Sequence, residues 1–504
     1  MKKKIDIIGA GVTGLCAGCY LQMNGYDTEI FEMHTLPGGV CTSWERKGYT
    51  FDGCIHWLVG SNPSDDYYHL WNELIDMESL TFINHQEYMR IEDKNGQFIS
   101  VSTNIDEFEK EMLSKAPEDK DIIIAFTTAT RKLLYIELPI DKAMETFNWL
   151  DMLKATFKLF PYMSTIKKWN RISAQDFANK CKNPLLKTTF KYIFAPEMSM
   201  LFLLMTLAWM HKKNAGYPIG GSLKFAQLIE KRYLELGGKI HYNNKVKKIM
   251  ATNNTASGIL LENGVTHYAD IVISAADGHY TIFDMLEGRY IDDRINHYYN
   301  HYKIFPSLLQ VSAGISRTFP GISHTQIFPL ETPLVIDPET KNEDIMLHIY
   351  NYDPTLAPEG KTVITSLLPT YNYKYWVDLR AQDKEKYNAE KERIGNELIE
   401  IMEKKLGNIK NNLEALDVST PATLIRYTGN WKGSFEGWFL TPEVGLKPMK
   451  KVLPGLTNFY MVGQWVEPGG GLPGCLNSGR SVAQIICKKD KKKFSTSPAG
   501  APSL

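Results

Sequence analysis

The sequence predicts an α/β fold made of several domains, on three observations. The chain has 504 residues, which is too long for a single hydrophobic core, so about two to four domains are expected. A strand, a glycine-rich turn, a helix and a second strand follow one another within residues 4–31. A strand, a glycine-rich loop and a helix recur near the other end, within residues 458–486. With 43% apolar and 23% charged residues, the composition is that of an ordinary globular protein.

The first element is a buried strand that leads into a glycine-rich turn. Residues 4–8 are mostly isoleucine, which is typical of a parallel strand, and Gly9, Gly11 and Gly14 follow with the spacing GxGxxG. Gly9 permits a tight turn, Gly11 lets the backbone approach a pyrophosphate, and Gly14 allows the helix to pack closely on the strand. The helix itself is expected over residues 15–24.

The second strand, 28–31, ends at an acidic residue, Glu32. In a dinucleotide-binding unit this position accepts hydrogen bonds from the ribose hydroxyls of the adenosine. The N-terminus of the preceding helix supplies free N–H groups and a partial positive charge for the phosphates. We therefore predict a Rossmann-type dinucleotide-binding domain. An acid at position 32 disfavours a 2′-phosphate, which argues against NADP in this site.

A second glycine motif, Gly38-Gly39, comes shortly after the acid and favours FAD over NAD. The pattern resembles that of the large group of amine oxidases and phytoene desaturases, in which this loop lines the cofactor. A disulfide reductase of the glutathione reductase type would pair Cys41 with a second cysteine, but Arg46 stands at that position. No second complete GxGxxG is present, so NAD(P)H or a quinone would have to dock transiently near the flavin.

Further segments carry the resemblance into the carotenoid branch of this group. Residues 48–52, Gly-Tyr-Thr-Phe-Asp, resemble a segment of carotenoid desaturases, carotenoid isomerases and retinol saturases. Residues 53–60 place His56 before an aromatic residue, and this version is most similar to that of the retinol saturases. Residues 220–249 resemble the segment in which the chain of the family's proteins returns to the cofactor domain. By that resemblance, Val246 would contact the adenine end through its backbone.

The most specific resemblance lies at residues 458–474, which are similar to the glycine- and proline-rich flavin loop of carotenoid desaturases. The resemblance implies that the following helix directs its N-terminus at the N1–C2=O edge of the flavin, where its partial positive charge would stabilise reduced flavin. Gln464 stands where many relatives have Asp, and Glu467 where many desaturases have His. The glycine motifs and the resemblance together imply these cofactor-binding residues: Gly9, Gly11, Gly14, Glu32, Gly38, Gly39, Val246, Gly463, Gln464, Gly471 and Leu472.

The matching segments are separated by stretches of different character, which predicts discontinuous domains. A three-layer FAD-binding domain is expected from residues 1–65, 212–290 and 422–488. A mixed α+β substrate domain with a helical, apolar subregion is expected from residues 66–211 and 291–421. The last residues, 489–504, are rich first in Lys and then in Ser, Pro and Ala, and we expect a disordered basic tail there.

The stretch 150–210 is rich in Phe, Leu, Met and Trp at helical spacings, and two interpretations stay open. One is the wall of an apolar substrate tunnel or a surface that contacts a membrane. The other is a set of core helices, because apolar helical stripes usually pack inside a protein. The most apolar part, 198–210, is shorter than the ~20 residues that span a bilayer.

Charge and cysteine content exclude several classes of protein. Lys and Arg together number 57, as do Asp and Glu, so no basic surface is expected to recruit nucleic acid. The seven cysteines are few and scattered, which argues against a disulfide scaffold and for a reducing, cytoplasmic environment. No metal site is predicted. The resemblance leaves peripheral contact with the inner face of a membrane open.

The resulting hypothesis is an FAD-dependent oxidoreductase that acts on carbon–carbon double bonds of an apolar polyene or isoprenoid lipid. By resemblance it would be a desaturase, saturase or isomerase of a carotenoid- or retinoid-like compound, with the flavin performing the redox step. An amine-oxidase-type flavoenzyme and a flavin-binding protein without turnover are the alternatives.

His56 and Glu467 are the predicted catalytic residues. The resemblance brings their segments to the isoalloxazine ring, and the reaction needs a proton donor or acceptor opposite the hydride. The alternative for each is a structural role. His56 would then satisfy a buried hydrogen bond, and Glu467 would cap the helix near Pro473 or pair with Arg480.

Overall fold

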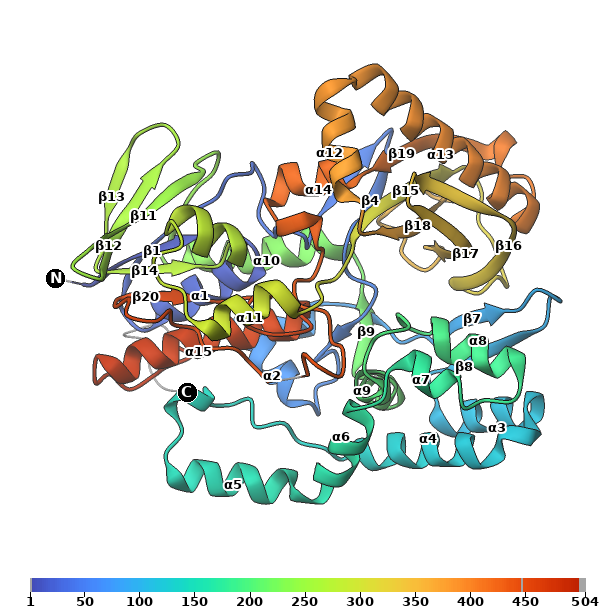
Figure 1. The fold of residues 1–504 in the computed structure, drawn as a ribbon, viewed down its shortest axis with the longest axis horizontal. Coiled ribbons are helices and arrows are strands. Elements are labelled where there is room, and N and C mark those ends of the chain that lie inside the picture. The colour runs from blue at the N-terminus through green and yellow to red at the C-terminus, as the bar shows by residue number, and fades with distance from the viewer. Residues whose placement is uncertain (1, 446, 498–504) are drawn as a thin grey trace.

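A five-stranded parallel sheet carries the N-terminal motif. The computed structural model, which describes residues 2–445 and 447–497, gives the strand order β10-β2-β1-β14-β20 (Figure 1). Ile5 of β1 pairs with Thr28 on one side and with Ile271 on the other. The strands therefore come from distant parts of the chain. Their bounds are β1 (Lys4–Ile8), β2 (Asp27–Phe31), β10 (Lys239–His241), β14 (Ile271–Ser274) and β20 (Phe459–Met461).

Two further layers cover the faces of this sheet. In β1, Ile5 and Ile7 share a hydrophobic core with the helices, whereas Ile8 belongs to the core on the opposite face. This alternation is the period of two that a strand imposes on its side chains. The layers confirm the predicted three-layer, Rossmann-type α/β arrangement. One layer consists of the helices α1 (Val12–Met23), α10 (Gly221–Glu235) and α15 (Gly471–Lys489); the other is an antiparallel sheet of β11 (Val246–Thr252), β12 (Thr255–Leu261) and β13 (Thr266–Tyr268).

A second, seven-stranded sheet stands beside the first part and has the order β19-β15-β18-β17-β16-β7-β8 (Figure 1). Its pairs are antiparallel except β16 with β7. The helices α12 (Tyr373–Gln382) and α13 (Lys384–Leu406) share a hydrophobic core with it. The strands are β7 (Glu87–Glu92), β8 (Phe98–Ser102), β15 (Ser307–Ile315), β16 (Thr325–Asp337), β17 (Thr340–Ile349), β18 (Thr362–Thr370) and β19 (Leu413–Ser419).

Strand pairing supports the domain division expected from the sequence, which we retain as a proposal. Residues 66–211 and 291–421 contribute all the strands of the seven-stranded sheet, and neither range contributes a strand to the parallel sheet. The two parts are joined through short strands. β9 (Ala215–Pro218) pairs with both β5 (Leu58–Val59) and β6 (Phe82–Ile83), while β3 (Ser43–Arg46) and β4 (Tyr49–Asp52) form a hairpin.

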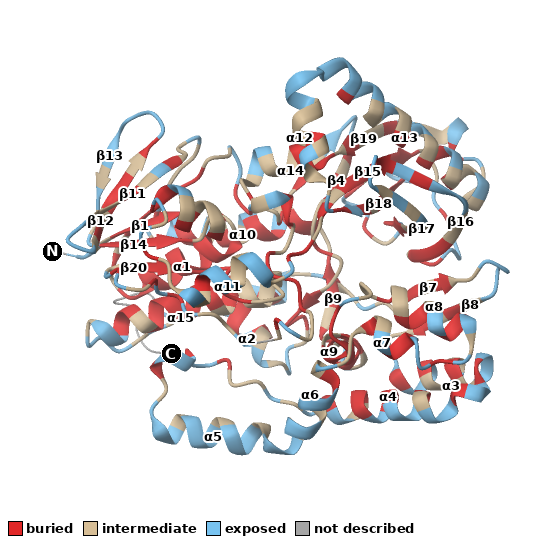
Figure 2. Ribbon diagram, in the orientation of Figure 1, coloured by how far each residue is buried: buried red, intermediate tan, exposed pale blue. Residues whose placement is uncertain are grey.

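The apolar stretch 150–210 divides into a buried part and an exposed part. The helix α9 (Met200–His211) is buried on nearly every side, as the core interpretation expects, and it also contributes Phe202, Met205 and Trp209 to a cavity wall (Figure 2). It packs with α3 (Ile105–Lys115), α4 (Lys120–Leu133), α6 (Met163–Asn170), α7 (Ala174–Ala178) and α8 (Pro184–Tyr192). By contrast, α5 (Trp149–Leu159) has no buried residue and lies along the outside of the molecule. Within the described ranges, no helix is both long and apolar enough to cross a bilayer.

The prediction of a disordered tail is wrong for residues 489–497. The ring of Phe494 lies 5.9 Å from that of Tyr20 and packs against the guanidinium of Arg480. The side chain of Asn24 donates a hydrogen bond to the carbonyl of Ser495 and accepts one from its N–H, both at 2.8 Å. These contacts hold residues 494 and 495 against α1. Residues 498–504 of the predicted tail lie outside the described residues.

Candidate functional site

A large cavity of about 1770 Å³ lies between the two parts of the molecule. It runs from the ends of β1 and β2 to the seven-stranded sheet and the apolar helices. Every predicted cofactor-binding residue lines it except Gly14, and both predicted catalytic residues line it as well. A Cβ atom at Gly14 would lie 2.0 Å from the carbonyl oxygen of Gly9, so this glycine serves packing, as its place in the motif predicts.

The glycine-rich turn leaves room for a ligand beside the N-terminus of α1. A Cβ atom at Gly11 would meet nothing nearer than the carbonyl oxygen of Gly38, at 4.0 Å, so the space beside it belongs to the cavity. The N-terminus of α1 has no side-chain cap and no acidic residue in its first turn. Its free N–H groups and partial positive charge suit a phosphate group.

Glu32 is held rigidly at the end of β2. One carboxylate oxygen accepts a hydrogen bond from the N–H of Ala10 at 2.6 Å, and the other accepts from the N–H of His34 at 2.8 Å. Burial raises the pKa of Glu32, while these N–H donors oppose the rise. Each oxygen retains acceptor capacity, which suits a pair of ribose hydroxyls.

A second helix N-terminus opens on the same cavity at its other end. After β20, the N–H of Gly463 donates to the hydroxyl of Ser478 at 3.0 Å, which ties the loop to α15. The helix α15 begins at Gly471 with no side-chain cap and no acidic residue in its first turn. Two helix N-termini whose own N-cap residues provide no side-chain cap lie on one cavity, which fits a cofactor that carries a pyrophosphate at one end and an electron-rich edge at the other.

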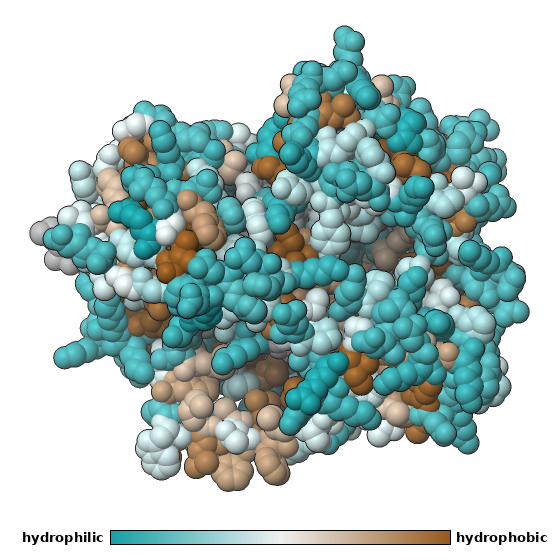
Figure 3. Space-filling model, viewed as in Figure 1, coloured by the Kyte–Doolittle hydropathy of each residue, from teal (hydrophilic) through white to brown (hydrophobic). Residues whose placement is uncertain are grey.

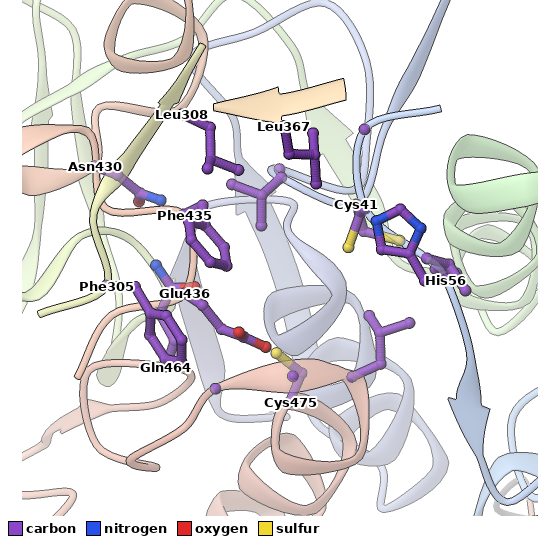
Figure 4. A pocket seen from close by; sticks show the side chains of 18 of the residues that line it. Cys41, His56, Phe305, Leu308, Leu367, Asn430, Phe435, Glu436, Gln464 and Cys475 are labelled. Atoms are coloured by element: carbon purple, nitrogen blue, oxygen red, sulfur yellow. The ribbon is translucent and has the colours of Figure 1, made fainter. Parts of the chain in front are cut away.

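Glu436 is a functional candidate that the sequence did not reveal. Figure 4 shows its carboxyl group in the cavity, on the same side as Gln464 and Cys475. A Cβ atom at Gly470 would lie 2.5 Å from the Cγ of Glu436, so the loop before α15 packs directly on this side chain. Burial raises the pKa of Glu436 to about 8, opposed by a hydrogen bond from the N–H of Gly471. Glu436 lies in no recognisable motif, so the sequence does not mark it as functional, and only the fold places its side chain in the cavity.

Glu467 has a different partner from either one expected. It forms an ion pair with Lys451 at 3.0 Å, whereas Arg480 pairs with Glu73 at 2.8 Å. It does not cap α15. Burial raises the pKa of Glu467, and the ammonium of Lys451 opposes the rise. The buried ion pair favours a structural role for this carboxylate.

His56 lies on the opposite side of the cavity from Glu436 (Figure 4). The buried carboxylate of Asp52 accepts hydrogen bonds from both the N–H and the hydroxyl of Ser222. The hydroxyl oxygen of Ser222 also accepts a hydrogen bond from the N–H of Ile55. This network fixes the loop before His56. The His56 ring stacks on that of His348 at 4.2 Å, and it makes no hydrogen bond to any residue in the described ranges. The expected structural hydrogen bond is therefore absent there. Burial lowers the pKa of His56 to about 4, so the imidazole is neutral near pH 7.

The remaining wall of the cavity is mainly apolar. The side chains of Leu308 and Leu367 project from the seven-stranded sheet, and those of Phe305 and Phe435 lie below them (Figure 4). The helical subregion adds further aromatic and aliphatic side chains, among them Tyr192, Phe194, Phe202, Met205 and Trp209. The chamber beyond the predicted cofactor residues therefore suits an apolar ligand.

Comparison with known proteins agrees with this geometry. The sequence profile described as flavin containing amine oxidoreductase matches residues 12–487. The 4,4′-diapophytoene desaturase of Methylomonas is 24% identical over 511 residues, which cover 98% of this chain and 96% of the relative. The chloroplastic prolycopene isomerase of Daucus carota is 26% identical over 499 residues, with 95% and 79% covered.

Solved structures share the fold at lower sequence identity. An oxidoreductase from Methanosarcina mazei has a TM-score of 0.60 at 17% identity and covers 95% of this chain and 99% of its own. A triple mutant of putrescine oxidase has a TM-score of 0.63 at 13% identity, with 97% and 99% covered. The curated relatives confirm the resemblance to the carotenoid desaturases and isomerases that residues 48–60 and 458–474 indicated. The chain belongs to the family of flavin-containing amine oxidoreductases and is an FAD-dependent oxidoreductase.

Proposed function

We propose that this protein moves a hydride and a proton across a carbon–carbon double bond of an apolar polyene or isoprenoid lipid. The observation that carries the proposal is one cavity that combines the N-termini of α1 and α15 with a mainly apolar chamber. The names of the curated relatives, a diapophytoene desaturase and a prolycopene isomerase, support a polyene as the substrate class.

Different residues along the cavity would hold different parts of the cofactor. The turn at Gly9 and Gly11 would hold the pyrophosphate, and Glu32 the ribose, while the loop before α15 would face the flavin ring. FAD, when bound, supplies the two-electron acceptor or donor. We further propose that NAD(P)H or a quinone exchanges electrons by transient docking.

Glu436 is our proposed proton carrier. With a pKa of about 8, its carboxyl group is mostly protonated near pH 7 and holds an acidic proton inside the chamber. In saturation or isomerisation, its carboxyl oxygen would give this proton to one carbon of the double bond. In desaturation, the ionised carboxylate would accept a proton from carbon instead. The sequence-based candidate Glu467 stays in its ion pair with Lys451.

Turnover tests separate this function from its alternatives. We expect the holoenzyme in detergent micelles to convert a carotenoid or retinoid polyene into a product with a changed number or geometry of double bonds, seen by chromatography with absorbance detection. The same preparation should show no flavin reduction by putrescine or other primary amines. Amine-dependent flavin reduction without polyene conversion would establish the amine oxidase alternative. A flavin that no donor reduces would establish a binding protein without turnover.

We also propose that the substrate reaches the chamber from a membrane surface, through α5. Trp149 and Phe157 of α5 and Phe160, which directly follows it, are 73%, 70% and 73% exposed, and Figure 3 shows an apolar patch over this part of the chain. The exposed Lys154, Lys167 and Lys168 lie on α5 and α6 and suit anionic lipid headgroups. Ile166 of α6 lines the cavity, so the patch borders the chamber wall. The face that contacts lipid would be the cytoplasmic face of the membrane.

Changing Trp149, Phe157 and Phe160 together to Glu is expected to abolish sedimentation with anionic vesicles. Each lost apolar side chain forfeits ~1.5–3 kcal/mol of burial in lipid, which is roughly a ten- to hundredfold weakening of vesicle binding per residue. Tyr268→Glu is the matched control, since Tyr268 is 72% exposed on β13 and lies outside the patch. Equal sedimentation of the triple variant and the control would show that α5 does not contact the membrane.

A further inference from the structure

Four histidines gather on one wall of the chamber, although they are far apart in the sequence. His56 precedes β5, His85 precedes β7, and His324 and His348 lie at the paired ends of β16 and β17. The rings of His56 and His348 stack at 4.2 Å, and those of His85 and His324 stack at 3.7 Å. All four line the cavity. Elsewhere the cavity wall is mainly apolar, so this row is a distinct polar feature.

The row consists of neutral imidazoles. Burial lowers the pKa of His56 to about 4 and that of His85 to about 3, and it lowers the pKa of the other two rings as well. Within the described ranges, no group of His, Cys, Asp and Glu side chains is arranged to hold a metal ion. The row therefore offers hydrogen-bonding nitrogens without charge, which suits a neutral polar group rather than an anion.

Hydrogen bonding defines which nitrogen of His348 carries the proton. The Nε2 of His324 lies 2.8 Å from the carbonyl oxygen of Glu87, so this nitrogen donates and the Nδ1 of His324 is an acceptor. The hydroxyl of Thr325 lies 2.9 Å from that Nδ1 and 3.0 Å from the Nδ1 of His348. The hydroxyl of Thr325 has one proton, so it donates to the Nδ1 of His324, and its oxygen accepts a hydrogen bond from the Nδ1–H of His348. The Nε2 of His348 is thereby left as an acceptor.

This acceptor has no partner among the described residues. The Nε2 of His348 is buried and unpaired, and His348 is 7% exposed. The His56 ring stacked on it likewise makes no hydrogen bond there, and Figure 4 shows this ring at the cavity. Buried polar atoms in native proteins normally have a hydrogen-bond partner. A hydrocarbon would leave both rings unpaired.

We propose that the chamber binds a polyene that carries a neutral hydroxyl group, with the hydroxyl donating to the Nε2 of His348 and accepting from the ring N–H of His56. The inference rests on the proposed function and narrows its substrate class to alcohols. An ether or aldehyde oxygen could only accept a hydrogen bond, so it would leave the Nε2 of His348 unpaired. A carboxylate would meet no positive charge in this row. His56 would then orient the substrate, while Glu436 moves the proton.

A proton relay is the competing use of such a row, and the hydrogen bonds argue against it. The path from His348 through Thr325 and His324 ends at the backbone carbonyl of Glu87. A peptide carbonyl has no proton to pass on. The path is therefore suited to fixing the tautomer of His348, and Thr325 is a positioning residue.

The test is equilibrium binding to the FAD-loaded protein in micelles, followed by ligand fluorescence. The probes are all-trans-retinol, its methyl ether, retinoic acid and the corresponding deoxy hydrocarbon. We expect the alcohol to bind about tenfold more tightly than the other three. His348→Phe, which keeps an aromatic ring for stacking, should remove this preference, and Thr325→Val should reduce it. His301→Phe, at an exposed position on α11 (Asp293–His301), is the control and should retain it.

The outcomes distinguish this inference from the function on which it rests. Equal affinity for the alcohol and the hydrocarbon in the wild type, with all polyenes bound, overturns the hydroxyl site and leaves the proposed function standing. Failure to bind any polyene overturns both. If the preference for the alcohol survives in His348→Phe while uptake of solvent deuterium into the product is lost, the row is a relay and the inference is wrong. FAD content and the melting temperature verify that each variant is folded, and Thr325→Val provides the test should His348→Phe not fold.

Discussion

Replacing Gly11 with Val is expected to abolish FAD binding and to leave the fold intact. Gly11 has a φ of −62°, which any residue adopts, and its Cβ position faces the cavity, with the nearest protein atom at 4.0 Å. The new side chain would therefore occupy the space meant for the pyrophosphate without striking the protein. Overpacking of this kind costs ~1–3 kcal/mol or more, and a cost of ~3 kcal/mol already lowers the affinity for FAD by more than roughly 100-fold.

The measurement is flavin absorbance per chain after desalting, together with the melting temperature with and without added FAD. Added FAD should raise the melting temperature of the wild type but not that of Gly11→Val. Gly14→Val is the contrasting variant: its Cβ would lie 2.0 Å from the oxygen of Gly9, so we expect it to lower the melting temperature even without cofactor. A full complement of FAD in Gly11→Val would disprove the assignment of this turn to the pyrophosphate.

Glu436→Gln is expected to lower turnover by about 10²–10⁴-fold while FAD occupancy stays at the wild-type level. Glutamine keeps the size of the side chain but cannot give or accept the proton. The direction of the pH dependence follows from the raised pKa of about 8. If the carboxylic acid is the active form, as in saturation or isomerisation, wild-type turnover falls as the pH rises through about 8. If the carboxylate is active, as in desaturation, turnover rises through the same range.

Glu467→Gln is the matched control for this experiment. The change would leave the buried ammonium of Lys451 with only Glu145, at 3.2 Å, so the melting temperature should fall. Turnover per bound flavin should remain near that of the wild type. The assignment of Glu436 fails if Glu436→Gln turns over at the wild-type rate, or if the two variants behave alike.

The N-terminal unit could be predicted closely because its determinants are local. The run of residues 4–8 is β1 as expected, and the helix predicted over 15–24 is α1, which starts at Val12 and ends at Met23. The spacing of the three glycines predicts the turn between this strand and this helix. The placement of Glu32 at the end of β2 follows from the same short stretch of chain.

The chemistry of the chamber could not be predicted in the same way, because it depends on contacts between distant segments. His56 and His348 meet only when β5 and β17 are assembled, and neither lies in a spacing that suggests a pair. The partner of Glu467 was missed for a similar reason. Lys451 precedes β20 in an irregular segment, where no helical or strand period indicates which way its side chain points.

The order of strands in the parallel sheet has a consequence for biosynthesis. β1 pairs with β14, and β14 with β20, so the sheet stays incomplete until residues 459–461 have been made. At ~5–20 residues per second on the ribosome, the stretch from the end of β14 at Ser274 to the start of β20 at Phe459 takes roughly 10 to 40 seconds, and the edge of β14 is open for that time. An open edge can pair with other chains, so this interval is when the nascent protein most needs a chaperone. The flavin site, which uses the N-termini of both α1 and α15, is among the last parts of the molecule to form, and FAD can stabilise only a chain whose synthesis has passed α15.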